Sequence, residues 1–208
     1  MKPKALWITE ASKAQLLEAQ QGDGVAVETL FSGISRGTEK LVFEGRVPES
    51  EHQTMRSPRQ EGEFTFPVKY GYCNVGKVLE GDLAGKLVFA LHPHQDNFRA
   101  HSEELTLIPE GVPAERAVLA ANMETALNIV WDSGAQAADK VAIVGAGVIG
   151  LLTGYLASRL PGSEVTLVDI NPAKEVLARE LGCSFATAEN APKECDVVIH
   201  TSATNEGL

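Results

Sequence analysis

Cysteine is scarce in this sequence, which contains only Cys73, Cys183 and Cys195. Their irregular spacing forms neither a disulfide framework nor a zinc ribbon, since both need cysteines in sets at characteristic intervals. Such sparse use fits the reducing cytoplasm. We therefore expect the chain to be stabilised by a hydrophobic core rather than by covalent cross-links.

Long hydrophobic runs are also absent. No stretch approaches the ~18 apolar residues of a membrane span. The opening residues, MKPKALWITE, lack the apolar core of a signal peptide. We therefore expect a cytoplasmic protein with no membrane partner. Hydrophobic residues make up 44% of the sequence and charged residues 22%, which is typical of a globular protein.

Positive charge is in the minority. The sequence has 18 Lys and Arg against 28 Asp and Glu, and its formal net charge is −10. Nucleic acid and anionic membranes bind basic surfaces, so this balance argues against both as partners. A small-molecule substrate is the partner that we expect.

The most informative segment is residues 140–150, which read KVAIVGAGVIG. Four apolar residues indicate a buried strand, and Gly145, Gly147 and Gly150 follow with G-x-G-x-x-G spacing. Gly145 allows a tight turn, Gly147 lets the backbone approach a pyrophosphate, and Gly150 lets the next helix pack on the strand. That helix begins at Val148 and Ile149, and its free N–H groups would face the anion.

A second apolar strand, residues 164–168, leads directly to Asp169. A carboxylate at this distance from the glycines accepts hydrogen bonds from both ribose hydroxyls and repels a 2′-phosphate, so NAD is favoured over NADP. Ile170 and Asn171 follow it, and neither is an arginine. The order of strand, turn, helix, strand and acid predicts a dinucleotide site. A glycine-rich turn that binds nothing is the alternative.

The sequence pattern changes near residue 115, from short β-like runs to alternating helices and strands. We therefore predict domains at 1–115 and 116–208. The first contains short β-like runs between turns, which indicates an antiparallel barrel or sandwich, at residues 5–9, 25–31, 70–79, 86–91 and 105–108. Its polar segment 46–62 is expected to be a long loop. The second begins with a helix over 114–131 and then alternates strands and helices up to a strand at 196–201.

The second domain contains fewer strands than its type usually has. A dinucleotide-binding sheet normally has six strands in the order 3-2-1-4-5-6, and this sequence supplies what resemble the first four. The open sheet edge would be apolar. We therefore expect either a fragment of a longer protein or an edge covered by a partner.

A β-rich domain, a linking helix and a nucleotide-binding domain in this order resemble the medium-chain dehydrogenase/reductase superfamily, the alcohol dehydrogenase-like proteins. Residues 32–39, SGISRGTE, are most similar to a branch that includes bacteriochlorophyllide-type hydroxyethyl dehydrogenases. The resemblance implies an α/β plus β fold: a GroES-like β-rich catalytic domain followed by a partial Rossmann domain with a doubly wound parallel sheet. It also implies an NAD(H)-dependent oxidoreductase with substrate bound between the domains, and it leaves a homodimer open.

The zinc-binding members of the superfamily differ from this sequence at all three catalytic ligand positions. Where they have cysteine, histidine and a further Cys or Glu, this sequence has Ser35, Tyr72 and Ala121. A catalytic zinc needs three protein ligands, so we predict a zinc-independent protein. Donors for a displaced zinc site do exist, although two histidines around a proline are more often hydrogen-bonded loop residues; these donors are His92, His94, Cys73 and either Glu39 or Glu124.

The resemblance also assigns cofactor contacts. It implies that Arg36 binds the pyrophosphate, that Thr125 approaches the nicotinamide, and that Asp169 and Lys174 flank the adenosine ribose. Two of these residues also have interpretations that involve no cofactor. Arg36 could be a solvated surface residue, and the Thr125 hydroxyl could be hydrogen-bonded to the preceding turn of its own helix. Two further candidates lie at the carboxyl end of the fourth strand, where such sheets bind ligands, namely Thr201 and Ser202.

The predicted catalytic residues are Thr38, Tyr72 and Ser35. The resemblance matches Thr38 to a hydroxyl that binds the substrate oxygen, although one extra residue precedes it here. Tyr72 could donate to the same oxygen, with Ser35 or Cys73 assisting, or it could be a packing aromatic with its hydroxyl at the rim. Hydroxyl groups suit a carbonyl, a quinone or enone, or a secondary alcohol as substrate. A zinc alcohol dehydrogenase with displaced ligands and a nucleotide-binding module without turnover are the other hypotheses.

Overall fold

A computed structural model describes residues 2–202, which fall into two compact units that divide after Ala121. The boundary that we expected, after residue 115, lies slightly before this division. Across the described residues, no helix is long and apolar enough to cross a membrane.

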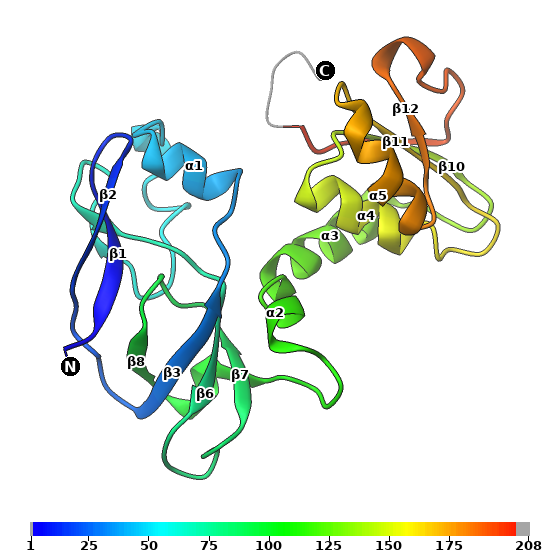
Figure 1. The fold of residues 1–208 in the computed structure, drawn as a ribbon. Coiled ribbons are helices and arrows are strands. Elements are labelled where there is room, and N and C mark those ends of the chain that lie inside the picture. Colours follow the sequence, from blue (N-terminus) through cyan, green and yellow to red (C-terminus); the bar gives the residue numbers. More distant parts are fainter. Residues whose placement is uncertain (1, 203–208) are drawn as a thin grey trace. The chain divides into compact units, whose positions relative to one another are not determined.

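The first unit consists of two antiparallel sheets (Figure 1). The strands of one, in order, are β2 (Lys13–Glu18), β1 (Lys4–Glu10), β5 (Val68–Lys69) and β4 (Glu61–Gly62). Those of the other are β8 (Asn97–Ala100), β3 (Val25–Ser32), β6 (Asn74–Val78), β7 (Leu87–Ala90) and β9 (Leu105–Leu107). The helical pieces are α1 (Thr38–Phe43), α2 (Ala114–Ala117) and the 3₁₀ turns η1 (Glu49–Glu51) and η2 (Ser102–Glu104).

The predicted runs in this unit are confirmed as β1, β3, β7 and β9, with one correction. The run at 70–79 is too long at its start, because the strand there is β6, which begins at Asn74. Sequence reasoning missed β2, all of whose residues are exposed and therefore show no alternation. It also missed β4, β8 and α1. The segment 46–62 is not a plain loop, because it contains η1 and β4.

The first unit buries two groups of hydrophobic side chains. One is formed by side chains from the strands of the larger sheet and includes Val27, Val78 and Phe98. The other includes Phe64 and Tyr70, and the partly buried Tyr72 packs against it. This packing fixes the loop between β5 and β6, which carries Tyr72.

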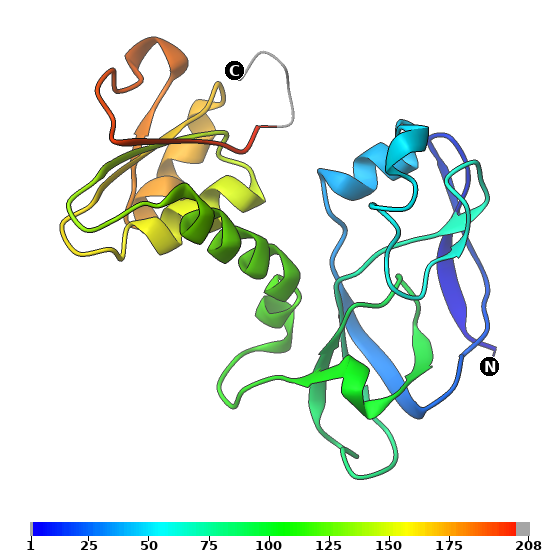
Figure 2. The ribbon, with the colours of Figure 1, turned by 180° about the vertical axis from the view of Figure 1, so that it is seen from behind.

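The second unit is a four-stranded parallel sheet in the order β12-β11-β10-β13, which is the predicted 3-2-1-4 arrangement. Figure 2 shows β13 running beside β10. The bounds are α3 (Ala120–Ser133), β10 (Lys140–Val144), α4 (Val148–Ala157), β11 (Glu164–Val168), η3 (Pro172–Lys174), α5 (Glu175–Glu180), β12 (Ser184–Ala186), η4 (Ala188–Asn190) and β13 (Val197–His200). The single helix expected over 114–131 is interrupted, since α2 ends at Ala117 and α3 begins at Ala120.

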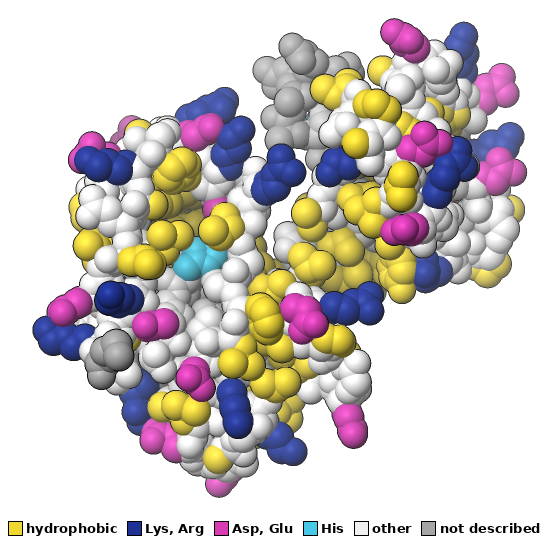
Figure 3. Space-filling view, in the orientation of Figure 1, with side chains coloured by type: hydrophobic (Ala, Val, Ile, Leu, Met, Phe, Trp, Pro, Cys, Tyr) yellow, Lys and Arg dark blue, Asp and Glu magenta, His cyan; other side chains and the backbone are white. Residues whose placement is uncertain are grey.

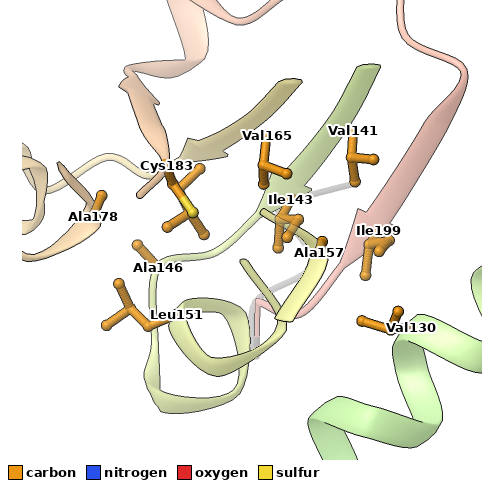
Figure 4. Packing of buried hydrophobic residues seen from close by; sticks show 11 residues of the cluster. Val130, Val141, Ile143, Ala146, Leu151, Ala157, Val165, Ala178, Cys183 and Ile199 are labelled. Carbon is orange, nitrogen blue, oxygen red and sulfur yellow. The ribbon is translucent and has the colours of Figure 1, made fainter. Parts of the chain in front are cut away.

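One hydrophobic core joins the helices of this unit to its sheet (Figure 4). Ile143 on β10 and Leu167 on β11 are fully buried. Leu151 of α4 and Val130 of α3 belong to the same cluster. The continuous apolar strands of the sequence therefore form a buried parallel sheet, as parallel strands require.

Replacement of Gly150 by alanine tests the close packing of α4. A Cβ there would lie 1.8 Å from the Gly145 carbonyl oxygen, so the helix would have to move. We expect Gly150→Ala to lower the free energy of unfolding by about 1–3 kcal/mol, measured by urea denaturation followed by circular dichroism. Gly147→Ala is the matched control, since a Cβ there meets no atom within 4 Å. Equal losses in both variants would contradict the packing.

A second prediction concerns pH. His92 is buried and stacks on Phe98, with 3.9 Å between ring centroids, and this burial lowers its pKa from 6.5 to about 4. Between these values the unfolded chain binds a proton that the folded chain does not. Stability is therefore present above pH 6.5 and lost as the pH falls towards 4, by up to about 3 kcal/mol. His92→Gln should show a smaller loss in urea denaturation at pH 7 and pH 4; an identical loss would show that His92 is not its source.

Candidate functional site

The glycine turn after β10 leaves the start of α4 open. Gly145 has φ of +104°, and a Cβ there would lie 2.8 Å from the Ser202 backbone nitrogen, so the turn requires glycine. Gly147 is the residue that precedes α4, and no side chain caps the helix. Among residues 2–202, a Cβ on Gly147 would meet no atom within 4 Å, so a ligand could approach the backbone closely at the start of α4. Such a helix start favours an anion.

Asp169 follows β11 and is held beside this turn. Its Oδ2 accepts a hydrogen bond from the Ala146 N–H at 2.7 Å, and its Oδ1 accepts one from the Asn171 N–H at 2.9 Å. Each carboxylate oxygen can accept more than one hydrogen bond. The side chain therefore braces the glycine turn and keeps acceptor capacity for the predicted ribose hydroxyls.

Thr201 and Ser202 come after β13 and adjoin the same turn. The Thr201 hydroxyl lies 2.8 Å from the Gly145 carbonyl oxygen and 3.1 Å from that of Val144, and it donates towards both. The Ser202 hydroxyl lies 2.7 Å from His200 Nε2. The structure thus gives Thr201 a bracing role in the turn.

The other predicted cofactor residues are also accessible to varying degrees. Val148 is exposed at the start of α4, and Ile149 beside it is half-buried. Lys174 lies at the end of η3 and is half-buried. Arg36, between β3 and α1, is exposed, as is Thr125 on α3. Their contacts with a cofactor remain predictions.

In the first unit, the three predicted catalytic residues lie together. The side chains of Ser35 and Thr38 lie near the Tyr72 hydroxyl. Burial, which is the larger effect, raises the pKa of Tyr72, whereas these two side chains lower it. The Tyr72 ring stands edge-on to the Tyr70 ring, with 6.3 Å between centroids. We call Ser35, Thr38 and Tyr72 the hydroxyl cluster.

A buried carboxylate and a buried histidine adjoin the hydroxyl cluster. The side chains of Glu39 and His94 are only 7% and 9% exposed, and Glu39 Oε2 lies 2.5 Å from His94 Nε2. The other Glu39 oxygen accepts the Ser35 N–H at 2.9 Å. On the far side of the ring, His94 Nδ1 is hydrogen-bonded to the hydroxyl of Ser32.

Sequence reasoning considered Glu39 and His94 only as metal donors, and it did not single out Ser32. A signal was available in part: Glu39 directly follows a candidate catalytic threonine, and His94 lies in a His-Pro-His segment. Their pairing joins positions 55 residues apart in the chain, and no local pattern reports such a contact.

The donors present do not fit a zinc ion. Among residues 2–202, no three His, Cys, Asp or Glu side chains are grouped so that they could hold a metal. His94 is occupied on both ring nitrogens, and His92 is stacked on Phe98. Burial raises the pKa of the Cys73 thiol to about 12, whereas zinc binds the thiolate. Glu124 lies on α3, where it accepts a hydrogen bond from Asn128 at 2.8 Å.

Hydrophobic side chains are exposed along the segment that carries the hydroxyl cluster. Phe31 directly precedes Ser32 and is 43% exposed, and Ile34 directly precedes Ser35 and is 67% exposed. On the face of the first unit seen in Figure 3, hydrophobic side chains surround a hollow in which a histidine is visible. The segment that carries Ser32 and Ser35 therefore exposes two large apolar side chains, Phe31 and Ile34.

Comparison with known proteins places these features in context. No family model matches the chain. Sorbitol dehydrogenase from Rattus norvegicus is 25% identical over 133 residues, which cover 62% of this chain and 34% of the rat protein. An aliphatic (R)-hydroxynitrile lyase from Linum usitatissimum is 33% identical over 89 residues, or 42% of this chain and 21% of that protein. The chain thus spans only about a third or less of these relatives' length.

Solved structures match nearly the whole chain. A protein from Sinorhizobium meliloti, described as a zinc-binding dehydrogenase bound to NADP, has a TM-score of 0.79 at 20% identity and is covered to 72%, with 100% of this chain matched. The quinone oxidoreductase of Thermus thermophilus, solved also with NADPH, has a TM-score of 0.67 at 21% identity, over 88% of this chain and 59% of its own.

The glycine turn, the sheet topologies of the two units and the matches to dehydrogenases all indicate the same fold. The chain has an alcohol dehydrogenase-like fold, with a GroES-like first unit and a partial Rossmann second unit.

Proposed function

We propose that this chain is part of a nicotinamide-dependent oxidoreductase that uses NAD(H) in preference to NADP(H) and works without zinc. Within the described part of the chain, the observation that carries the proposal is the start of α4: no side chain caps it, a Cβ on Gly147 would meet no atom within 4 Å, and Asp169 is held beside the same turn. This combination of anion-favouring N–H groups and a ribose-binding carboxylate suits a dinucleotide.

The residues of the second unit would hold the cofactor, which when bound exchanges a hydride with the substrate. The backbone at Gly147, Val148 and Ile149 would bind the pyrophosphate, and Asp169 would accept from the ribose hydroxyls. In the same proposal, Lys174 lies beside the adenosine ribose, Arg36 reaches the pyrophosphate, and Thr125 approaches the nicotinamide. Thr201, which braces the turn, and Ser202, which lies beside Gly145, would border the bound cofactor.

The hydroxyl cluster of the first unit would bind the substrate oxygen. A tyrosine phenol is protonated at neutral pH, and burial raises the pKa of Tyr72 further, so its hydroxyl is available as a hydrogen-bond donor. A neutral hydroxyl polarises a carbonyl less than a metal ion does. Together with the exposed Phe31 and Ile34, this favours apolar, conjugated substrates such as enones and quinones, or secondary alcohols in the reverse direction.

The first test is a titration of the purified chain with NADH and with NADPH, followed by nicotinamide fluorescence, with elemental analysis of the same sample. Saturable NADH binding without bound zinc supports the proposal. Stoichiometric zinc would instead support a metal-dependent dehydrogenase, and binding of neither dinucleotide would overturn the proposed cofactor.

Asp169 should set the preference between the two dinucleotides. We expect Asp169→Asn to narrow the ratio of the two dissociation constants about tenfold, because the charge that repels a 2′-phosphate is lost. An amide oxygen still accepts the Ala146 N–H, whereas Asp169→Ala removes that contact and should also weaken NADH binding. The fluorescence titration measures both variants; an unchanged ratio in Asp169→Asn would remove the ribose assignment.

Tyr72 should act on turnover rather than on folding. Without its hydroxyl donor, Tyr72→Phe is expected to lower kcat about 100-fold, with KM little changed, for whichever substrate of a quinone, enone and alcohol panel is turned over. Tyr70→Phe is the matched control, because the Tyr70 hydroxyl donates to the Met55 carbonyl at 2.7 Å and should affect stability alone. Wild-type kcat in Tyr72→Phe would show that its ring only packs.

A further inference from the structure

The contacts around His94 define a single hydrogen-bonded chain. A carboxylate can only accept, so Glu39 receives a hydrogen from His94 Nε2 across 2.5 Å. The neutral ring then carries no hydrogen on Nδ1, and this atom accepts the hydroxyl hydrogen of Ser32. Glu39 thus fixes the tautomer of His94, and His94 fixes the direction in which the Ser32 hydroxyl donates. This order is the one in which an imidazole can take a proton from a hydroxyl.

The three side chains differ in their access to solvent. Glu39 and His94 are buried, whereas Ser32, at the end of β3, is exposed. Glu39 holds the buried ring of His94 from one side, and the exposed Ser32 connects this buried pair to the surface.

Backbone contacts hold this chain beside the hydroxyl cluster. The Gly33 N–H donates to the Cys73 carbonyl at 2.9 Å, which ties the segment of Ser32 and Ser35 to the residue after Tyr72. The His94 ring lies over Gly71, directly before Tyr72, and a Cβ on Gly71 would come within 2.8 Å of that ring. The glycine thus makes room for the histidine next to the candidate substrate-binding hydroxyls.

We propose that Ser32, His94 and Glu39 form the proton relay of this site; the inference rests on the proposed oxidoreductase function. In alcohol oxidation, a bound oxidised nicotinamide would take up the hydride from the substrate C–H bond, and the substrate O–H bond would give its proton to Ser32 Oγ. Ser32 passes its own proton to His94 Nδ1, and the imidazolium later returns a proton to water. Carbonyl reduction runs through the same steps in reverse.

The test compares His94→Ala, Ser32→Ala and the wild type in steady-state turnover. We expect kcat to fall about 100-fold in both variants while the dissociation constant for NADH stays unchanged. Added imidazole should raise the kcat of His94→Ala at least tenfold and should leave the kcat of Ser32→Ala unchanged. In both variants the solvent deuterium isotope effect on kcat should rise, because proton transfer becomes rate-limiting. These results would support the relay.

His101→Ala is the control, since this exposed histidine contacts Asp23 elsewhere in the same unit, and its kcat should equal that of the wild type. Wild-type kcat in Ser32→Ala overturns the relay alone, even where His94→Ala fails to fold. A loss in folded His94→Ala without imidazole rescue or a larger isotope effect also overturns it. A wild type that binds neither dinucleotide, or turns over no substrate, overturns the proposed function and the relay with it.

Discussion

The second unit depends on the close approach of α4 to the end of β10. Because Gly150 has no side chain, the helix can lie against the Gly145 carbonyl. A Cβ on residue 150 would lie only 1.8 Å from that carbonyl oxygen. Thr201 and Asp169 then brace the turn from the two neighbouring strands. The same closeness directs the free N–H groups of α4 outward at Gly147. The backbone arrangement that packs α4 closely against β10 therefore also forms the helix start that suits a phosphate.

A comparable constraint shapes the first unit. Gly71 has φ of +126° and lies under the ring of His94. The loop that follows packs the Tyr72 ring edge-on to Tyr70, with Ser35 and Thr38 near its hydroxyl. The resemblance stated from the sequence implies that zinc-binding dehydrogenases have a metal-binding histidine at this position. Here a tyrosine occupies the loop, and the histidine beside it comes from another part of the chain. The resulting donors suit hydrogen bonding and proton transfer better than zinc binding.

The sequence predicted the second unit more fully than the first for a physical reason. The strands β10 and β11 are buried, and the glycines that join β10 to α4 have fixed spacing, so the local pattern carries the structure. In the first unit, β2 is exposed on both faces, and α1 has only six residues, so neither produces a periodic signal. The hydroxyl cluster was found because the resemblance aligned its members. The pairing of Glu39 with His94 depends on a long-range contact, which residue type and spacing do not report.

The most direct test of the account is a nuclear magnetic resonance titration of the ¹⁵N-labelled chain with NADH. We predict saturable shifts of the backbone amide signals of Gly145, Gly147, Val148 and Gly150, because the start of α4 would contact the pyrophosphate. The same shifts should be absent in Gly147→Ala, which retains the fold but fills the open space in front of the helix. Unchanged amide signals in this turn at saturating NADH, or the same shifts in Gly147→Ala, would contradict the central claim.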